Sequence, residues 1–200
     1  GQLSVSQLVA LRHGPGELAR SLRRPLPAKP RPLARRGTAF HAWLETLYGQ
    51  QRLLDVDEMP GAADESAVPD EDLLELQQRF RDSQWWGRVP VEVELPFETS
   101  IEGIVIRGRV DAIFRDDDGG YDVVDWKTGQ VPSGVEAQAA AVQLAAYRLA
   151  WSSLAGVPLD DVRAAFHYVL DGETVRPVDL LDADGLAALV AAVPVRQEVW

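Results

Sequence analysis

Hydrophobic and polar residues alternate along four stretches of the chain, which is the pattern of β-strands with one buried face. These stretches cover residues 89–98, 104–114, 121–127 and 164–170. The third begins after Asp118-Gly119-Gly120, a sequence typical of a tight turn, so we expect the second and third strands to form a hairpin. The pattern therefore predicts three consecutive strands and, after a longer gap, a fourth.

Helical periodicity, with apolar residues recurring every three or four positions, marks the segments around these strands. It predicts a short helical lead-in over residues 4–24 and helices over residues 37–49, 70–86, 134–155 and 184–193, the first of these ending at Gly49. After the lead-in, the strands and helices follow as three strands, a helix, a strand and a helix. We therefore expect an α/β fold in which helices flank a central, mostly antiparallel or mixed sheet of about four strands.

Two segments show neither pattern. Four prolines between residues 25 and 32 disfavour a regular helix and predict a stiff, extended basic connector. Residues 50–69 are rich in Asp, Glu, Ala and Gly and predict a loop. We expect residues 1–36 to form the lead-in and connector, and residues 37–200 to form one domain without internal repeats. Because the chain starts with Gly1 rather than Met, we expect it to be a piece of a longer protein.

The composition excludes several classes of site. The chain has 200 residues, no cysteine and a formal net charge of −11. Without cysteine there is no disulfide framework, thiolate zinc site, iron–sulfur cluster or cysteine catalysis. We see no secretory signal, no apolar run long enough to span a bilayer and no P-loop for ATP, so we expect a cytoplasmic fragment without its own ATP site.

The charge is segregated along the chain. Residues 12–36 hold eight basic residues and one acid, whereas residues 55–75 hold nine acids and no base. The net negative charge argues against passive, non-specific binding to nucleic acid, because affinity for phosphates normally comes from excess Lys and Arg. A basic arm and an acidic loop are thus predicted in one acidic chain.

Asp111, Asp125 and Lys127 form the strongest chemical signal. Alternate residues of a strand point to the same side, so Asp125 and Lys127 share a face, and Asp111 is expected to meet Asp125 across the hairpin. Two carboxylates on adjacent strands make a partial oxygen site for Mg²⁺, and a neighbouring ammonium can neutralise charge that develops on a phosphate. The alternative is a solvated strand pair, with Arg109 neutralising Asp111 on the surface.

Four short motifs follow one another along the chain: Gly37–Glu45 (GTAFHAWLE), Gly108–Asp111 (GRVD), Asp125–Gly129 (DWKTG) and Gln143–Tyr147 (QLAAY). Each is weak alone, since His41 with Glu45 can be a helix-surface pair and Gln143 with Tyr147 a partly buried polar pair. Their order and their strand and helix context make the combination specific. Together they resemble, from about residue 37 to residue 151, the RecB-type nuclease domain, a branch of the PD-(D/E)XK nuclease superfamily.

The resemblance implies a restriction-endonuclease-like core with the element order αβββαβ and a site for Mg²⁺ or Mn²⁺. It implies that His41, Asp111 and Asp125 bind the metal, with the backbone carbonyl of Trp126 as a further ligand. An imidazole among oxygen ligands would make Mn²⁺ an effective substitute for Mg²⁺. Lys127 matches the catalytic lysine of the family.

Further residues have supporting roles in the family. Gln143 and Tyr147 match a helix motif that borders the active site and contacts DNA or supports the catalytic residues. Glu94 matches an upstream acidic position, for which Glu92 is the alternative. Several relatives carry four cysteines that hold an iron–sulfur cluster, and this chain has none, so no cluster is expected.

The resemblance is strongest to nuclease domains of actinobacterial helicase-nucleases of the AdnAB type, in which a UvrD-like motor precedes the nuclease. It implies a bacterial, nucleoid-associated protein whose motor lies in the same chain and feeds a single-stranded DNA end to the site. A second helicase-nuclease subunit is an expected partner. Arg35 and Arg36, at the end of the basic arm, would line the DNA path; the alternative is that the arm docks on a neighbouring domain or stays solvated.

The function expected from these signals is metal-dependent hydrolysis of DNA during the processing of double-strand break ends. One alternative is a catalytically silent nuclease fold that serves as a DNA-binding or protein-interaction scaffold in a helicase complex. Another is a protein–protein adaptor that uses Trp85-Trp86 and the acidic loop.

Overall fold

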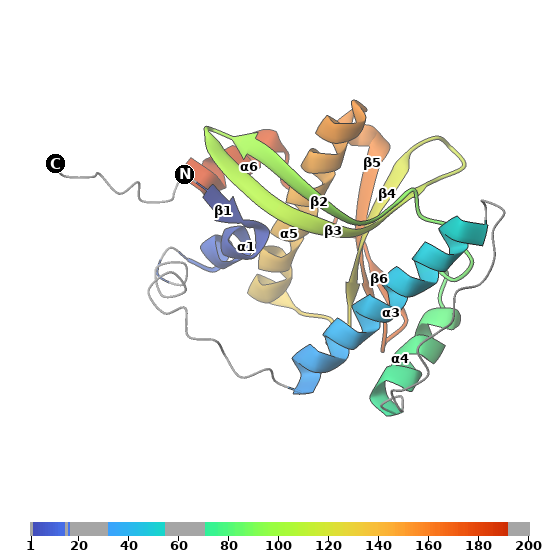
Figure 1. Cartoon of the computed structure of the whole chain (residues 1–200). Coiled ribbons are helices and arrows are strands. Elements are labelled where there is room, and N and C mark those ends of the chain that lie inside the picture. Colours follow the sequence, from blue (N-terminus) through green and yellow to red (C-terminus); the bar gives the residue numbers. More distant parts are fainter. Residues whose placement is uncertain (1, 15, 17–31, 55–70, 192–200) are drawn as a thin grey trace.

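A computed structural model of the chain describes residues 2–14, 16, 32–54 and 71–191, and these form a mixed sheet of six strands with helices on both faces (Figure 1). The strand order is β1-β3-β4-β5-β6, with β2 pairing β3 as well. The β1–β3 and β4–β5 pairs are parallel and the others antiparallel. The strands are β1 (Gln2–Ser4), β2 (Glu92–Ile101), β3 (Ile104–Arg115), β4 (Tyr121–Lys127), β5 (Val162–Tyr168) and β6 (Glu173–Val175).

The α/β class and the mixed sheet are confirmed, and the expected number of about four strands was too low. β1 and β6 have three residues each, which is too short to show an alternating pattern. Helix α5 connects β4 to its parallel neighbour β5, as a parallel pair requires. The described helices are α1 (Val5–His13), α3 (Pro32–Leu54), α4 (Glu71–Arg81), α5 (Gly134–Ala155) and α6 (Ala183–Ala191).

Two hydrophobic cores lie on the two faces of the sheet. One packs α1, α5 and α6 against it through fully buried residues such as Leu8, Leu144 and Leu186. The other packs α3 and α4 through a largely aromatic cluster that includes Phe40 and Phe80. No helix in the described part of the chain is both long and apolar enough to cross a membrane.

Helix α3 is longer than predicted at both ends. It begins at Pro32 and includes Arg35 and Arg36, because proline is well tolerated in the first turn, where its missing N–H has no helical partner. It continues through Gly49 to Leu54, so Gly49 is not its stop. The predicted lead-in contains α1, which ends at His13. Its later part, the connector up to residue 31 and most of the predicted loop fall in residues 17–31 and 55–70, which lie outside the described residues.

Other boundaries differ by less. Helix α4 ends at Arg81, before the predicted Trp86, and residues 82–87 form turns. Strand β5 ends at Tyr168 instead of continuing to residue 170. Trp85 is fully buried in the α3–α4 core while Trp86 is half-exposed, so the two tryptophans do not form the surface patch that an adaptor function would use.

The edge of β3 that faces β4 is shared by two strands. β1 pairs with Val105–Arg107 and β4 pairs with Ala112–Arg115, which leaves residues 108–111 between them. Gly108 is required in this stretch, because a Cβ there would lie 2.6 Å from Val5 Cγ2 and 2.7 Å from the Phe97 ring. Close packing of α1 and β2 around Gly108 thus borders the opening in the sheet.

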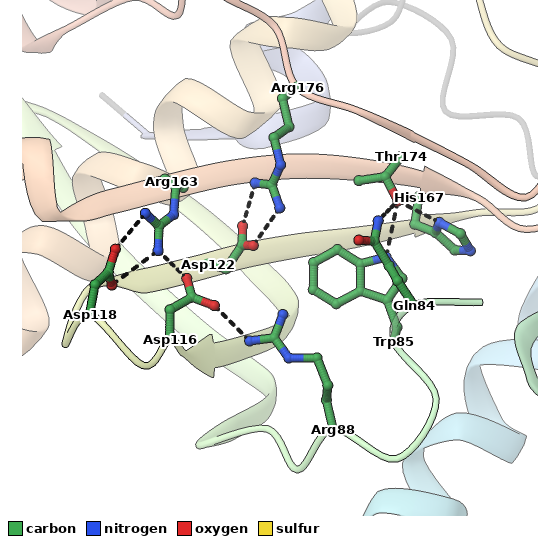
Figure 2. Close-up of polar contacts among 10 residues, drawn as sticks. All are labelled: Gln84, Trp85, Arg88, Asp116, Asp118, Asp122, Arg163, His167, Thr174 and Arg176. Carbon is green, nitrogen blue, oxygen red and sulfur yellow. Dashed lines mark hydrogen bonds and ion pairs between the residues drawn. The ribbon is translucent and has the colours of Figure 1, made fainter.

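A charged network joins the other end of β4 and β5 (Figure 2). Arg163 at the start of β5 pairs with Asp116 in the turn after β3, and Asp116 also accepts a hydrogen bond from Arg88 at 2.7 Å. Arg176 donates two hydrogen bonds, of 2.8 and 2.6 Å, to the buried carboxylate of Asp122 on β4. These pairs hold the strand starts together, away from the strand ends that carry the candidate site.

A partly buried polar cluster joins the carboxyl end of β5 and β6 to the turn after α4 (Figure 2). Thr174 Oγ1 accepts hydrogen bonds from Gln84 Nε2 at 2.6 Å and Trp85 Nε1 at 3.1 Å, so its own proton is left to donate to His167 Nδ1 at 3.0 Å. The His167 ring lies edge-on to Trp126, with 6.0 Å between the ring centroids. The cluster thereby supports the segment of β4 from which the site is built.

Candidate metal-dependent active site

The site lies where β3 and β4 stop pairing. Their ladder ends at Ala112 and Val124, so Asp111 and Asp125 are the next residues on either side of the opening. The backbone N–H of Trp126 donates to Asp111 Oδ2 at 2.8 Å. The Asp111 side chain thus replaces a backbone acceptor for this amide of β4, and the bond holds the Asp111 carboxylate against β4.

Helix α3 brings His41 to the opening. Phe40, Leu44 and Tyr48 are buried against the sheet, which anchors the helix and turns His41, one position along, toward β4. His41 Nε2 lies 3.2 Å from the carbonyl oxygen of Trp126. Because a carbonyl only accepts, the bonding proton is on Nε2, which leaves Nδ1 of the neutral ring with its lone pair.

Glu94 enters the site through a local distortion of β2. Its φ is +48°, in the left-handed region that a glutamate rarely adopts. Val93 before it packs on the α3–α4 core and Leu95 after it packs on the α1–α5 core, so the strand changes faces at Glu94. Strain of this kind is concentrated at functional sites. Between the two glutamates considered, Glu94 is the one placed beside His41.

Three potential metal ligands converge at this point. His41 Nδ1 lies 3.7 Å from Glu94 Oε1 and 3.8 Å from Asp111 Oδ2. One ligand atom from each residue lies within 4.8 Å of those of the other two, and this is the single such group of three among the described residues. The group joins α3, β2 and β3, and Glu94 takes a more central place in it than the sequence indicated.

Asp125 approaches the same opening from β4 and is held by α5. Gln143 Nε2 donates to Asp125 Oδ1 at 2.8 Å and lies 2.8 Å from Tyr147 Oη, while Lys127 Nζ donates to Gln143 Oε1 at 3.0 Å. Lys127 Nζ also lies 2.7 Å from Asp125 Oδ2. The amide of Gln143 therefore orients both the carboxylate and the ammonium group of the Asp-Trp-Lys motif.

The electrostatics of the site indicate an excess of negative charge. Burial, and next the nearby Asp125, raise the pKa of Asp111 well above its ordinary value. Burial alone would lower the pKa of His41, but Glu94, Asp111 and Asp125 outweigh it and the pKa is raised. The nearby imidazole of His41 lowers the pKa of Glu94. Burial, and then Asp125, raise the pKa of Tyr147, so its phenol stays protonated.

The residues present fit a divalent cation. Asp125 is buried, and the Lys127 ammonium group compensates its Oδ2 from 2.7 Å. Burying the carboxylates of Asp111 and Asp125 side by side is costly unless a further cation compensates them, and the pKa of Asp111 is raised accordingly. Carboxylate oxygens with one imidazole suit Mg²⁺ and Mn²⁺.

The site opens into a cavity of about 580 Å³. His41, Glu94, Arg109 and Lys127 line it, together with Gly37, Thr38, Ala42, Glu45, Trp126, Thr128 and Gly129. Polar and charged side chains from α3, β2, β3 and β4 thus face one open space. A substrate that enters it meets the acidic group and Lys127 together.

The two arginines predicted to line a DNA path have different environments. Arg36 is largely buried; it donates from Nη2 to the Thr128 carbonyl at 3.2 Å and pairs with Asp72 of α4 at 3.8 Å. It therefore ties α3 and α4 to the loop after Lys127. Arg35 is exposed and does not line the cavity.

Two residues at the cavity had no role in the sequence-based prediction. Arg109 was considered only as a surface partner of Asp111, although it stands in the same Gly-Arg-Val-Asp motif. Thr128, directly after Lys127, lies close enough to α3 that a Cβ at Gly37 would be 3.1 Å from its Oγ1. Adjacency to motif residues was the only signal available for either residue.

Comparison with known proteins places the chain in a family. The model of the PD-(D/E)XK nuclease superfamily matches residues 2–196. No curated protein matches significantly. A solved structure described as "Crystal structure of SSO0001" is similar, with 18% identity and a TM-score of 0.44, over 95% of this chain and 73% of that one. Because the superfamily model covers nearly the whole chain, the protein belongs to the PD-(D/E)XK nuclease superfamily.

Proposed function

We propose that this protein is a divalent-metal-dependent deoxyribonuclease that hydrolyses phosphodiester bonds of DNA. The observation that carries the proposal is the convergence of His41, Glu94 and Asp111 within 4.8 Å, beside the buried carboxylate of Asp125. Membership of a nuclease superfamily supports the choice of substrate. Lys127, the proposed catalytic lysine, lies 2.7 Å from Asp125.

Three carboxylates and one imidazole would together bind the cation. Glu94, Asp111 and Asp125 would supply oxygens, and His41 would supply Nδ1. The Trp126 carbonyl, which the resemblance assigns as a ligand, accepts the hydrogen bond from His41 Nε2 and would fix the imidazole orientation. When bound, Mg²⁺ or Mn²⁺ neutralises charge on the phosphate and lowers the pKa of water.

Lys127 would act on the reacting phosphate or on the attacking water. Its ammonium group faces the cavity and is held by the Gln143 amide, so it can donate to charge that develops on the phosphate oxygens. Gln143 would fix the positions of the Lys127 and Asp125 side chains relative to each other, and Tyr147, one turn further along α5, would hold Gln143 in place. These two residues are thus proposed to position the motif.

We further propose the setting in which this nuclease works. The ordered motifs resemble those of AdnAB-type helicase-nucleases, so a motor in the same chain, with a second subunit, would deliver a single-stranded end during the processing of double-strand breaks. Residues 37–200 would form most of the nuclease domain, to which β1 and α1 add a strand and a packed helix, and residues 1–36 as a whole would lead to it from the motor, in a bacterial cytoplasm. The acidic net charge supports delivery by a motor, because an acidic chain attracts DNA poorly on its own.

A silent scaffold remains the competing function, and the intact site argues against it. A fold kept only for binding has no need of partly buried acidic groups that converge on His41, which cost stability unless a cation joins them. Nor does it need the left-handed backbone at Glu94.

The test is cleavage of labelled single-stranded DNA with Mn²⁺ or Mg²⁺. We expect Asp125→Ala and Lys127→Ala to lower the rate by about 10²-fold or more. Glu136→Ala, an exposed change on the first turn of α5, is the matched control and should have no effect. Unchanged cleavage in both site variants would sink the assignment.

Calorimetry with Mn²⁺ gives a second readout that does not depend on DNA delivery. Glu94→Ala and Asp111→Ala should abolish binding, because each removes one of three converging ligands. Lys127→Ala should still bind, since the ammonium group is not a ligand. Equal binding by all variants would place the cation elsewhere.

A further inference from the structure

Arg109 is the cationic side chain at the cavity with the most donors still available. Among the described residues, it lines the cavity together with Lys127 and His41. Lys127 already contacts Gln143 and Asp125, and its remaining donor is the one proposed to act on the reacting phosphate. Arg36, behind the cavity wall, is occupied by Thr128 and Asp72.

Arg109 is held only loosely. Its side chain is 65% exposed, and the hydrogen bond that it makes among the described residues runs from Nη1 to Glu94 Oε2 at 3.4 Å, just beyond the usual range. A guanidinium carries five N–H donors, so most of those of Arg109 are left for solvent or for a ligand in the cavity. On β3 it stands two residues before Asp111, about 7 Å along the strand.

The charge of the site creates a need for such a group. Glu94 lines the cavity in which a phosphodiester would bind, Asp111 and Asp125 lie close behind it, and the chain as a whole carries −11. A divalent cation and Lys127 together only balance the three carboxylates, so no net positive charge is left for the phosphate. A guanidinium beside them can bind two oxygens of a phosphate at once.

We propose that Arg109 binds a backbone phosphate of the DNA strand in the cavity. The proposal rests on the nuclease function proposed above and adds a substrate-binding residue to it. Glu94 holds Arg109 over the cavity through Oε2 while its Oε1 faces His41. The same carboxylate thus orients the phosphate-binding group and takes part in the metal site.

Arg107 provides a matched comparison on the same strand. It lies two residues further from Asp111, is 57% exposed, and donates to Glu98 at 2.6 Å. It does not line the cavity. The two arginines therefore have the same charge and similar exposure and differ in their position relative to the site.

The experiment measures the affinity of a fluorescein-labelled single-stranded oligodeoxynucleotide in a Lys127→Ala background with Mn²⁺, so that the probe is not cut. We expect Arg109→Ala to weaken binding about tenfold or more and to reduce the salt dependence of log K by about 0.7, one phosphate contact on a single strand. Arg107→Ala should change binding little. Arg109→Lys should restore part of the affinity, because it keeps the charge but loses the two-pronged contact.

Two results would overturn the proposal. Equal weakening by Arg109→Ala and Arg107→Ala would mean that the strand contributes only diffuse charge. A loss of Mn²⁺ affinity in Arg109→Ala, measured by calorimetry without DNA, would mean that Arg109 acts through Glu94 rather than on the phosphate. Failure of the nuclease function itself is separate, and shows as cleavage by the Lys127→Ala background or as no Mn²⁺ binding by the wild type.

Discussion

The side-chain amide of Gln143 makes hydrogen bonds to two residues of the candidate site at once. Its amide nitrogen donates to Asp125 and its oxygen accepts from Lys127. We expect Gln143→Ala to lower kcat by about 10- to 100-fold, the usual cost of removing a group that orients a ligand. The measurement is steady-state cleavage of labelled single-stranded DNA, with Glu136→Ala of the same helix as control. A change in KM at constant kcat would contradict a positioning role.

At the scale of single residues, the sequence predicts most of the side chains that the fold brings to the candidate site. Asp111, Asp125 and Lys127 follow from strand alternation, and His41, Gln143 and Tyr147 follow from the resemblance; all lie at or next to one opening in the sheet. Their chemical roles stay predictions. The position of Glu94 was out of reach for a pattern argument, because its left-handed φ breaks the alternation on which such arguments depend.

Among the elements, β3 depends on the absence of a side chain at Gly108. A Cβ at this position would overlap Val5 Cγ2 and the buried Phe97 ring. We expect Gly108→Ala to lower the free energy of unfolding by about 1–3 kcal/mol, the typical cost of overpacking. Urea denaturation measures the change, and an unaltered midpoint would show that α1 and β2 move apart easily.

Gly49 is the matched opposite case. It lies inside α3, and no atom lies within 4 Å of the position its Cβ would take. Gly49→Ala should therefore raise the free energy of unfolding by about 0.5–1 kcal/mol through helix propensity and the entropy of the unfolded chain. The same denaturation experiment checks it; a destabilised variant would mean that α3 needs flexibility at this point.

The long elements were predictable and the short ones were not. Strands β2, β3 and β4 and helix α5 show their period over seven residues or more. β1 exists because it pairs with Val105–Arg107, a contact between distant segments that no local pattern contains, and β6, next to β5, is too short to show a pattern. Pro32 reads as the end of the connector, because its place in a run of four prolines hides the helix that it begins.

For the whole molecule, the buried His167 makes stability depend on pH. Burial lowers its pKa to about 4 from 6.5, so the unfolded chain takes up a proton at a higher pH than the folded one. The stabilisation is complete above pH 6.5 and is lost as the pH falls toward 4, by at most about 3 kcal/mol. His41, whose pKa is raised, contributes with the opposite sign.

The comparison with His167→Gln isolates this contribution. Urea denaturation at pH 7.5 and pH 5 should show a smaller loss of stability in the variant than in the wild type, because the variant has no ring to protonate. Metal ions are left out of both series, so that any linkage to the candidate site is the same. Identical losses in the two proteins would assign the pH dependence to other groups.

For the whole molecule, the net charge says less about the candidate site than the placement of the charged residues in the fold does. The net charge of −11 pointed away from nucleic acid, whereas the cavity combines carboxylates with Lys127 and Arg109. That combination depends on segments far apart in the sequence, α3 with β2, β3 and β4. The net charge does not reveal this combination of side chains, whereas the fold does, because it brings these segments together.

The bond between the Trp126 amide and Asp111 makes one backbone position a natural reporter of the site. Its acceptor is a titrating side chain rather than a neighbouring strand. In an NMR spectrum, the Trp126 amide resonance should therefore shift when Mg²⁺ is added and exchange its hydrogen faster in Asp111→Ala. The Val124 amide, where β4 still has its ladder partner Ala112, should change much less. Occupancy of the site can then be followed without substrate, turnover or a partner protein.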